Sequence, residues 1–122
     1  MALEKKVLEI NEYPYIPNNK KKLFSGYRIG ECFIYQNFYW NIWHIPSKSY
    51  IWQGVKRRRD AIKLYEIIRQ IIIEEFGEIS FTKYNEIVKN LEEGEGYILR
   101  QKLWKNLTKT FKENNIEIYG DN

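Results

Sequence analysis

The residues best suited to do chemistry in this 122-residue chain are four consecutive cations, Lys56-Arg57-Arg58-Arg59. A helical pattern begins directly after them, so their side chains surround the free backbone amides of a helix start. Guanidinium groups beside free amides favour a phosphate, and the run therefore predicts phosphate contact. The competing interpretation is a solubilising basic patch, with Asp60 as the acid usual in a first helical turn.

Cationic and aromatic residues are concentrated in the same part of the chain. The net charge is +4, yet residues 21–58 alone carry seven cations and one carboxylate, Glu31, and half of the aromatic residues. Positive charge displaces counterions from nucleic acid, and aromatic rings stack on bases. If these rings do not simply pack in the core, the segment predicts a surface for nucleic acid or for a protein partner. The predicted surface comprises Arg28, Lys48, Lys56, Arg57, Arg58, Arg59, Tyr39, Trp43, Tyr50 and Trp52.

The remaining titratable residues show no catalytic pattern. His44 is the single histidine, and no carboxylate lies near it in the sequence. Cys32 is the single cysteine, which excludes an intramolecular disulfide and a cysteine-based zinc site. Glu92, Glu93 and Glu95 flank glycines and are typical of a solvated turn. We therefore predict a protein that is not an enzyme and that binds no metal and no organic cofactor.

Composition narrows the class of protein. Hydrophobic residues make up 43% of the chain, enough for a packed core. No apolar run approaches the roughly 18 residues that span a bilayer, and the first six residues lack the apolar stretch of a signal peptide. We expect a cytoplasmic protein without a membrane partner. The abundance of Ile, Lys, Asn and Tyr indicates an AT-rich genome, which fits a phage or an AT-rich bacterium.

The elements that must position the basic run divide into three segments. Residues 1–22 are predicted to be extended, because Pro14 and Pro17 favour extended chain and a polar loop follows them. Residues 23–77 favour strands and then a helix, and residues 78–122 favour a helical module that shares the same core. Strands are predicted near 23–29, 31–36, 39–45 and 49–54, and a helix at 58–76 with Gly77 as its C-terminal cap.

The predicted fold class is α+β: a three- or four-stranded antiparallel sheet packed on a central helix, followed by a C-terminal helical hairpin. In the hairpin, Thr82 is the predicted N-cap of the first helix, the second helix covers 97–113, and residues 116–119 form a short closing strand. Apolar residues on both sides of the 58–76 helix predict that the sheet covers one side and the hairpin the other. The predicted core includes Ile34, Ile42, Leu64, Ile68, Ile72, Leu103 and Leu107.

Residues 31–75 resemble the small arm-site DNA-binding domain of phage tyrosine integrases. The resemblance lies in Trp40-Asn41-Ile42-Trp43 and in the junction Gly54-Val55-Lys56-Arg57-Arg58-Arg59-Asp60-Ala61, which leads from a sheet into a helix. Val55 stands where the family has an aromatic residue. The resemblance implies a sheet that enters a DNA groove, with basic residues on the strands and at the junction.

Residues 67–119 are similar to the N-terminal autoinhibitory region of primary bacterial sigma factors, which forms a small helical bundle. The similar segments run from Gly77-Glu78-Ile79-Ser80 to Ile87 and from Asn115 to Tyr119. That region is strongly acidic, whereas this segment is neutral, and Asn115 stands where glycine is usual. The same residues also fit a helix-turn-helix whose second helix exposes Arg100, Gln101, Lys105 and Lys109.

Two functions therefore stay open. The first is a small non-catalytic accessory or regulatory protein, related to phages or mobile elements, that binds the phosphate backbone of DNA or RNA. The second is a protein-interaction module that inhibits or modulates a host nucleic-acid-processing complex, since exposed Trp and Tyr residues are favoured interface anchors. A homodimer is possible in either case.

Overall fold

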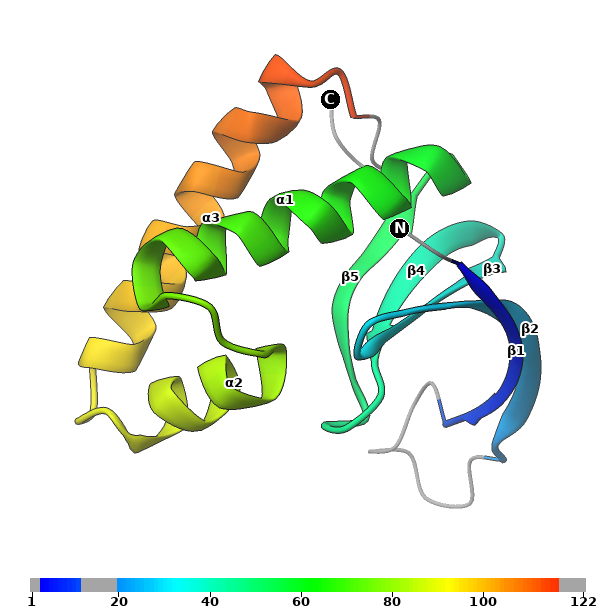
Figure 1. Cartoon of the computed structure of the whole chain (residues 1–122), viewed down its shortest axis with the longest axis horizontal. Helices are drawn as coiled ribbons and strands as arrows, with labels where there is room; N and C mark the ends of the chain where they lie inside the picture. Colours follow the sequence, from blue (N-terminus) through cyan, green and yellow to red (C-terminus); the bar gives the residue numbers. More distant parts are fainter. Residues whose placement is uncertain (1–2, 12–19, 117–122) are drawn as a thin grey trace.

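The computed structural model describes residues 3–11 and 20–116, in which a five-stranded antiparallel sheet is followed by three helices (Figure 1). The strands lie side by side in sequence order, so β1 and β5 form the two edges of the sheet. The α+β class and the antiparallel sheet agree with the prediction. The strands are β1 (Glu4–Ile10), β2 (Lys22–Ile29), β3 (Cys32–Asn37), β4 (Tyr39–His44) and β5 (Ser49–Val55).

The predicted number of strands, three or four, is wrong because β1 joins the sheet. It pairs with β2 along its whole length, from Glu4 opposite Arg28 to Ile10 opposite Lys22. The pattern of apolar residues at the start of the chain fits either a strand or a helical turn. In the structure, pairing with β2 makes this segment a strand. Pro14 and Pro17, which predict extended chain, lie outside the described residues.

The sheet is strongly curled, and its strands carry a hydrophobic core on each face (Figure 1). On one face, Ile34 and Ile42 pack with the helices. On the other face, the curl of β1 brings Ile10 to Phe33 and Trp43, and each of these three side chains is at most 5% exposed. We call this second group, which also includes Tyr35, the inner core.

A glycine allows the close approach that the curl requires. Gly26 in β2 lies opposite Tyr35, and a Cβ atom at Gly26 would clash with the carbonyl oxygen of Ile34 and come within 2.9 Å of the Phe33 ring. No other residue type fits there without displacing β3.

Strand β5 pairs irregularly with β4, and the irregularity determines which side chains reach the helices. The register shifts on both sides of the Ile42–Trp52 pair, so β5 contains residues without a direct partner. Gly54 lies in one shift with φ of 88°, and its N–H donates to Asn41 Oδ1 at 3.2 Å. At the other shift, Ile51 and Trp52 are consecutive and yet both pack against the core that faces the helices.

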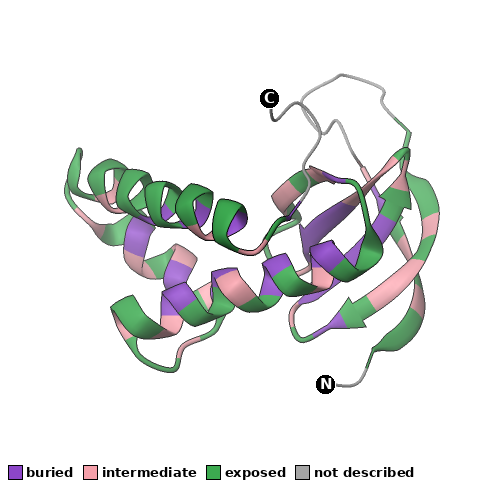
Figure 2. Ribbon diagram, turned by 90° about the horizontal axis from the view of Figure 1, so that it is seen from above, coloured by how far each residue is buried: buried purple, intermediate pink, exposed green. Residues whose placement is uncertain are grey.

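Helix α1 (Arg58–Phe76) covers one face of the sheet and has the bounds that the sequence predicts. Gly77 ends it with φ of 81°, and its N–H donates to the carbonyl oxygen of Ile73. Buried residues lie along α1 where it meets the sheet and where it meets the other helices, so α1 buries two sides as predicted (Figure 2). The predicted core residues Ile34, Ile42, Leu64, Ile68, Ile72, Leu103 and Leu107 are all buried.

The last two helices, α2 (Phe81–Asn90) and α3 (Glu95–Glu113), contact each other and α1. The N-cap of α2 is Ser80, whose Oγ accepts from Lys83 N at 3.1 Å, so the prediction of Thr82 as N-cap is wrong by two residues. Helix α3 starts two residues before the predicted position. Ile116 is buried in the common core, and the rest of the predicted closing strand, 117–119, lies outside the described residues.

Candidate nucleic-acid interface

The four cations of the basic run lie where β5 ends and α1 begins, and all four are exposed. Arg57 is the N-cap residue of α1, with extended backbone and no side-chain hydrogen bond to the helix. Asp60 supplies the acidic residue of the first turn and is buried. The backbone therefore presents the cations at the positive end of the helix dipole, as the sequence predicts.

Arg58 connects the basic run to the sheet. Its Nη1 donates to the hydroxyl oxygen of Tyr27 at 2.8 Å, and its guanidinium carbon lies 5.0 Å from the centroid of the Tyr27 ring. The second contact has the geometry of a cation–π interaction. Since Tyr27 belongs to β2, the start of α1 is fixed against a strand that lies far from β5 in the sheet order.

A hollow of about 660 Å³ opens on the sheet surface beside this contact. It extends across β1, β2, β3 and β4, and Trp40 at its β4 end pairs with Val55, the residue directly before Lys56. None of its lining residues is acidic, and two are lysines from β1. We call it the Trp40 hollow; it is lined by Lys5, Lys6, Val7, Ser25, Gly26, Tyr27, Gln36 and Trp40.

Two predicted cations lie away from this region. Arg28 pairs with Phe33, and therefore points to the sheet face opposite Tyr27, where its Nε donates to the Gly30 carbonyl oxygen at 3.1 Å. Lys48 lies in the turn before β5, whereas Lys56 follows the end of that strand. Seven residues of strand separate them by roughly 20 Å. The structure therefore does not gather Lys48 and Arg28 with the basic run.

The predicted aromatic surface is mostly packing. Trp43 is 5% exposed and belongs to the inner core, where Tyr50 meets it edge to face with ring centroids 4.8 Å apart. Tyr50 also hydrogen-bonds to the hydroxyl of Tyr35. Trp52 faces the helices and packs against Phe111 with centroids 5.1 Å apart. Of the four predicted rings only Tyr39, half-buried at the start of β4, lies outside these two cores.

The aromatic residues that do line an open surface, Tyr27 and Trp40, were missed by the sequence analysis. Strand alternation indicates that Trp40 and Ile42 share a face, but not that Trp40 stays half-buried at the start of α1 while Ile42 is fully buried. Lys5 was missed as well, because it joins the surface only through the pairing of β1 with β2, which sets it opposite Tyr27. Neither the exposure of Trp40 nor the position of the β1 lysine can be inferred from the sequence, because both depend on how the elements pack in three dimensions.

The single histidine has a carboxylate partner that the sequence did not indicate. His44 is fully buried, and its Nε2 lies 2.8 Å from Glu31 Oε2, while its Nδ1 lies 2.6 Å from the hydroxyl of Ser47. Glu31 Oε2 also accepts from the backbone N and the hydroxyl of Thr82, at 3.1 and 3.2 Å. One carboxylate thus connects the sheet to the first turn of α2.

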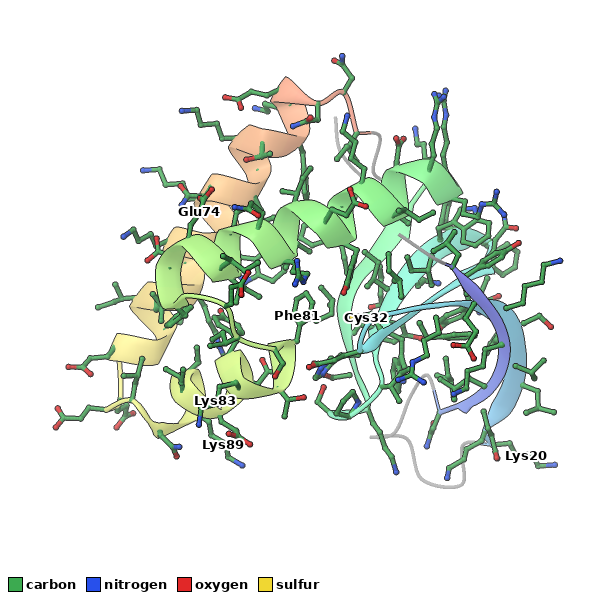
Figure 3. The ribbon with its side chains drawn as sticks, viewed as in Figure 1. Lys20, Cys32, Glu74, Phe81, Lys83 and Lys89 are labelled. Atoms are coloured by element: carbon green, nitrogen blue, oxygen red, sulfur yellow. The ribbon has the colours of Figure 1, made fainter. Side chains whose placement is uncertain are left out.

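Partial burial alone would raise the pKa of Glu31, but hydrogen bonds from His44, Thr82 and Ser80 lower it overall. Figure 3 shows Phe81 between α2 and the sheet, and its ring centroid lies 5.9 Å from that of His44. A hydroxyl, an imidazole and a carboxylate in this order also occur in hydrolases. Here the carboxylate also binds the helix start, so its evident role is to attach α2 to the sheet.

Cys32 lies under the helices and does not face the Trp40 hollow. It is fully buried, and burial raises the pKa of its thiol far above the usual value. A protonated, buried thiol is a weak nucleophile. Within residues 3–11 and 20–116, no three His, Cys, Asp or Glu side chains gather in a way that could hold a metal ion.

Comparison with known proteins found no matching family model, no matching curated protein and no matching solved structure. Among the helices of the described residues, none is long and apolar enough to cross a membrane.

Proposed function

We propose that the protein binds nucleic acid without catalysis, as a small accessory or regulatory protein of a phage or mobile element. One observation carries the proposal: the exposed basic run is continuous, through the Arg58–Tyr27 contact, with a hollow that has lysines and aromatic rings in its lining and no carboxylate. Phosphates would lie at Lys56–Arg59 and at Lys5, which pairs with Tyr27 and shares its face. A base or sugar would lie on Trp40.

The resemblance to the integrase arm-site domain fits this proposal in the position of the basic junction. The sheet face that would meet nucleic acid, however, must be the one toward α1. Phe33, Tyr35 and Trp43 occupy the sheet face away from α1 and are buried in the inner core. Nucleic acid would therefore approach on the face that α1 shares, at the end that α1 leaves open.

The test is a titration of a short duplex and of a single strand of the same sequence, in low salt. Replacing Arg57 and Arg58 together by Ala should weaken binding by about 1–3 kcal/mol and lower the salt slope by about one unit per lost contact. The loss should be similar for different sequences, because phosphate contacts do not read bases.

A matched control removes two cations from α3. Lys105 and Lys109 are exposed there and would contact DNA if α2 and α3 acted as a helix-turn-helix. Replacing both by Ala should leave affinity close to that of the wild type. The proposal fails if the wild type shows no micromolar affinity for DNA or RNA in low salt. A larger loss for the α3 control would move the interface to α3.

A further inference from the structure

The turn between β3 and β4 carries a large apolar side chain that the fold leaves in solvent. Phe38 is 91% exposed, the highest value among the large apolar side chains of residues 3–11 and 20–116. It belongs to neither hydrophobic core, although Phe33 and Tyr35 of the preceding strand are fully buried. Since a phenylalanine ring stabilises a fold through its burial, this ring contributes little to stability.

The backbone at Phe38 is also unfavourable for its residue type. Its φ is 64°, in the left-handed region that glycine and asparagine adopt most readily. A bulky side chain in this region costs free energy and persists only where the surrounding structure imposes it. Positions that break a local preference without a gain in packing are concentrated at functional sites. Phe38 is unfavourable both in exposure and in backbone conformation, so its ring is a candidate for contact with another molecule.

Pairing across the β3–β4 hairpin places this turn at one end of the Trp40 hollow. Gln36 and Trp40 are paired, and both line the hollow. Phe38 lies between them in the chain, two residues from each, so its Cα is at most about 7 Å from that of Trp40. A base that leaves a nucleic-acid stack at Phe38 therefore has Trp40 within reach.

The basic run lies at the same end of the sheet. Trp40 also pairs with Val55, which directly precedes Lys56. Figure 1 shows the β3–β4 turn at the end of the sheet where α1 begins. The cations of Lys56–Arg59 are exposed there, so the phosphates that flank a base at Phe38 would meet positive charge.

The width of the turn favours nucleic acid over a protein as the partner. Proteins that deform a duplex insert a single apolar side chain, such as phenylalanine, between two base steps, and their cations hold the phosphates. The core of a protein interface is instead a continuous apolar patch. Gln36 and Asn37, which precede Phe38, are polar, and the turn presents one exposed apolar ring at the end of the sheet that carries four cations.

We propose that Phe38 is a wedge that enters the base stack of a duplex, and that the preferred substrate is a duplex containing a mismatched or unpaired base. The ring takes the place of one stacking partner, and the displaced base lies on Trp40 in the hollow. This inference rests on the proposed function, since the basic run supplies the phosphate contacts that hold the duplex. It names the class of nucleic acid that the protein selects.

The free energy of unstacking selects that substrate. A wedge must open a base step, and the cost is smallest where the base is already mismatched, damaged or unpaired. Phosphate contacts are the same for a paired and a mismatched duplex, so they add affinity without preference. The preference should therefore depend on Phe38 and Trp40, whereas the basic run sets the overall affinity and its dependence on salt.

Two short fluorescein-labelled duplexes that differ only in one central mismatched base pair test the wedge, by fluorescence anisotropy in low salt. The wild type should bind the mismatched duplex about tenfold more tightly than the paired one. Equal affinity for the two duplexes overturns the wedge and leaves the proposed function standing. Absence of binding to both overturns the proposed function and the wedge with it.

Variants at the turn locate the preference. Phe38→Asn removes the ring and should reduce the preference to about twofold or less, whereas Phe38→Tyr keeps a ring and should retain most of it. The matched control is Tyr97→Ala, which removes an aromatic side chain that is 67% exposed on α3 and should retain the full preference. An unchanged preference in Phe38→Asn, or an equal loss in Tyr97→Ala, overturns the wedge.

The stability of the same variant separates a wedge from a structural residue. Phe38→Asn should unfold at the same urea concentration as the wild type or at a higher one, because asparagine suits the left-handed backbone and no buried ring is lost. A clearly lower midpoint would mean that the ring packs in the fold, and would overturn the proposal. Replacing Arg57 and Arg58 together by Ala should weaken binding of both duplexes equally and keep the ratio of their affinities. A loss of that ratio would place the preference in the basic run and overturn the wedge.

Discussion

The two faces of the sheet are built from the same aromatic segment and differ in how far they are covered. On the face away from α1, Phe33, Tyr35 and Trp43 are closed over by the curl of β1 and β2 and form a core. On the face toward α1, Tyr27 and Trp40 line a hollow at the start of the helix, where Arg58 contacts Tyr27 and Trp40 is only partly buried against the core. The comparison shows that an aromatic residue on a strand is buried in a core or lines an open surface depending on which neighbouring element covers its part of the strand.

The sheet face toward α1 is also covered at one of its ends and partly open at the other. At one end His44 is fully buried under α2, which Glu31 holds in place. At the other end Trp40 lies beside the exposed basic run. The contacts of Glu31 with Thr82 therefore attach α2 at the His44 end of this face.

The largest expected effect comes from the inner core. Trp43→Ala removes a ring that is 5% exposed and leaves a cavity among large rings, so we expect a loss of about 3–5 kcal/mol in the free energy of unfolding. Urea denaturation measures it. Trp43→Phe, which retains most of the packing, should lose much less. An unfolding free energy close to that of the wild type in Trp43→Ala would mean that the inner core does not stabilise the fold.

Much of the fold was predictable because the information is local. The 58–76 helix is marked by the period of its apolar residues and by Gly77, and the seven predicted core residues, three of them on this helix, are buried. The strand β1 was not predictable in this way, since its seven residues acquire a face only through pairing with β2 across an intervening segment.

The candidate site was predictable only in its charged half. Four adjacent cations before a helix are visible in the sequence, and they lie where the sequence predicts. The rings were assigned by composition, and composition does not say which face the curl of β1 and β2 will cover. Trp43 and Tyr50 are thus packing residues, whereas Tyr27 and Trp40, equally aromatic and in the same segment, line the hollow.

An intermediate effect is expected at the Trp40 hollow. Trp40→Ala removes the ring proposed to stack on a base, so binding to a single strand should weaken by about 1–3 kcal/mol. Fluorescence titration measures this, and urea denaturation should show a smaller loss of stability than in Trp43→Ala, since Trp40 is half-buried. If Trp40→Ala binds as the wild type does, phosphate contact alone accounts for binding and the hollow is not part of the interface.

The smallest expected effect concerns the contact of Glu31 with Thr82, which holds α2 over the His44 end of the sheet face toward α1. Glu31→Gln keeps an acceptor near Thr82 but removes the charge, and at neutral pH it should lower the unfolding free energy by about 1 kcal/mol. The folded state lowers the pKa of Glu31 from its ordinary value of 4.5, so the stabilisation by the carboxylate is fully present above that pH. It is lost as the pH falls through the lowered folded-state pKa.

The wild type should therefore lose its advantage over Glu31→Gln in acid, and the two unfolding free energies should converge below pH 4.5. Denaturant titrations at a series of pH values measure this difference directly. Thr82→Val, which removes one donor and keeps the charge, is the matched control and should retain most of the pH dependence. A difference between wild type and Glu31→Gln that is constant with pH would mean that the charge of Glu31 does not hold α2, because the amide of the variant keeps an acceptor and cannot ionise.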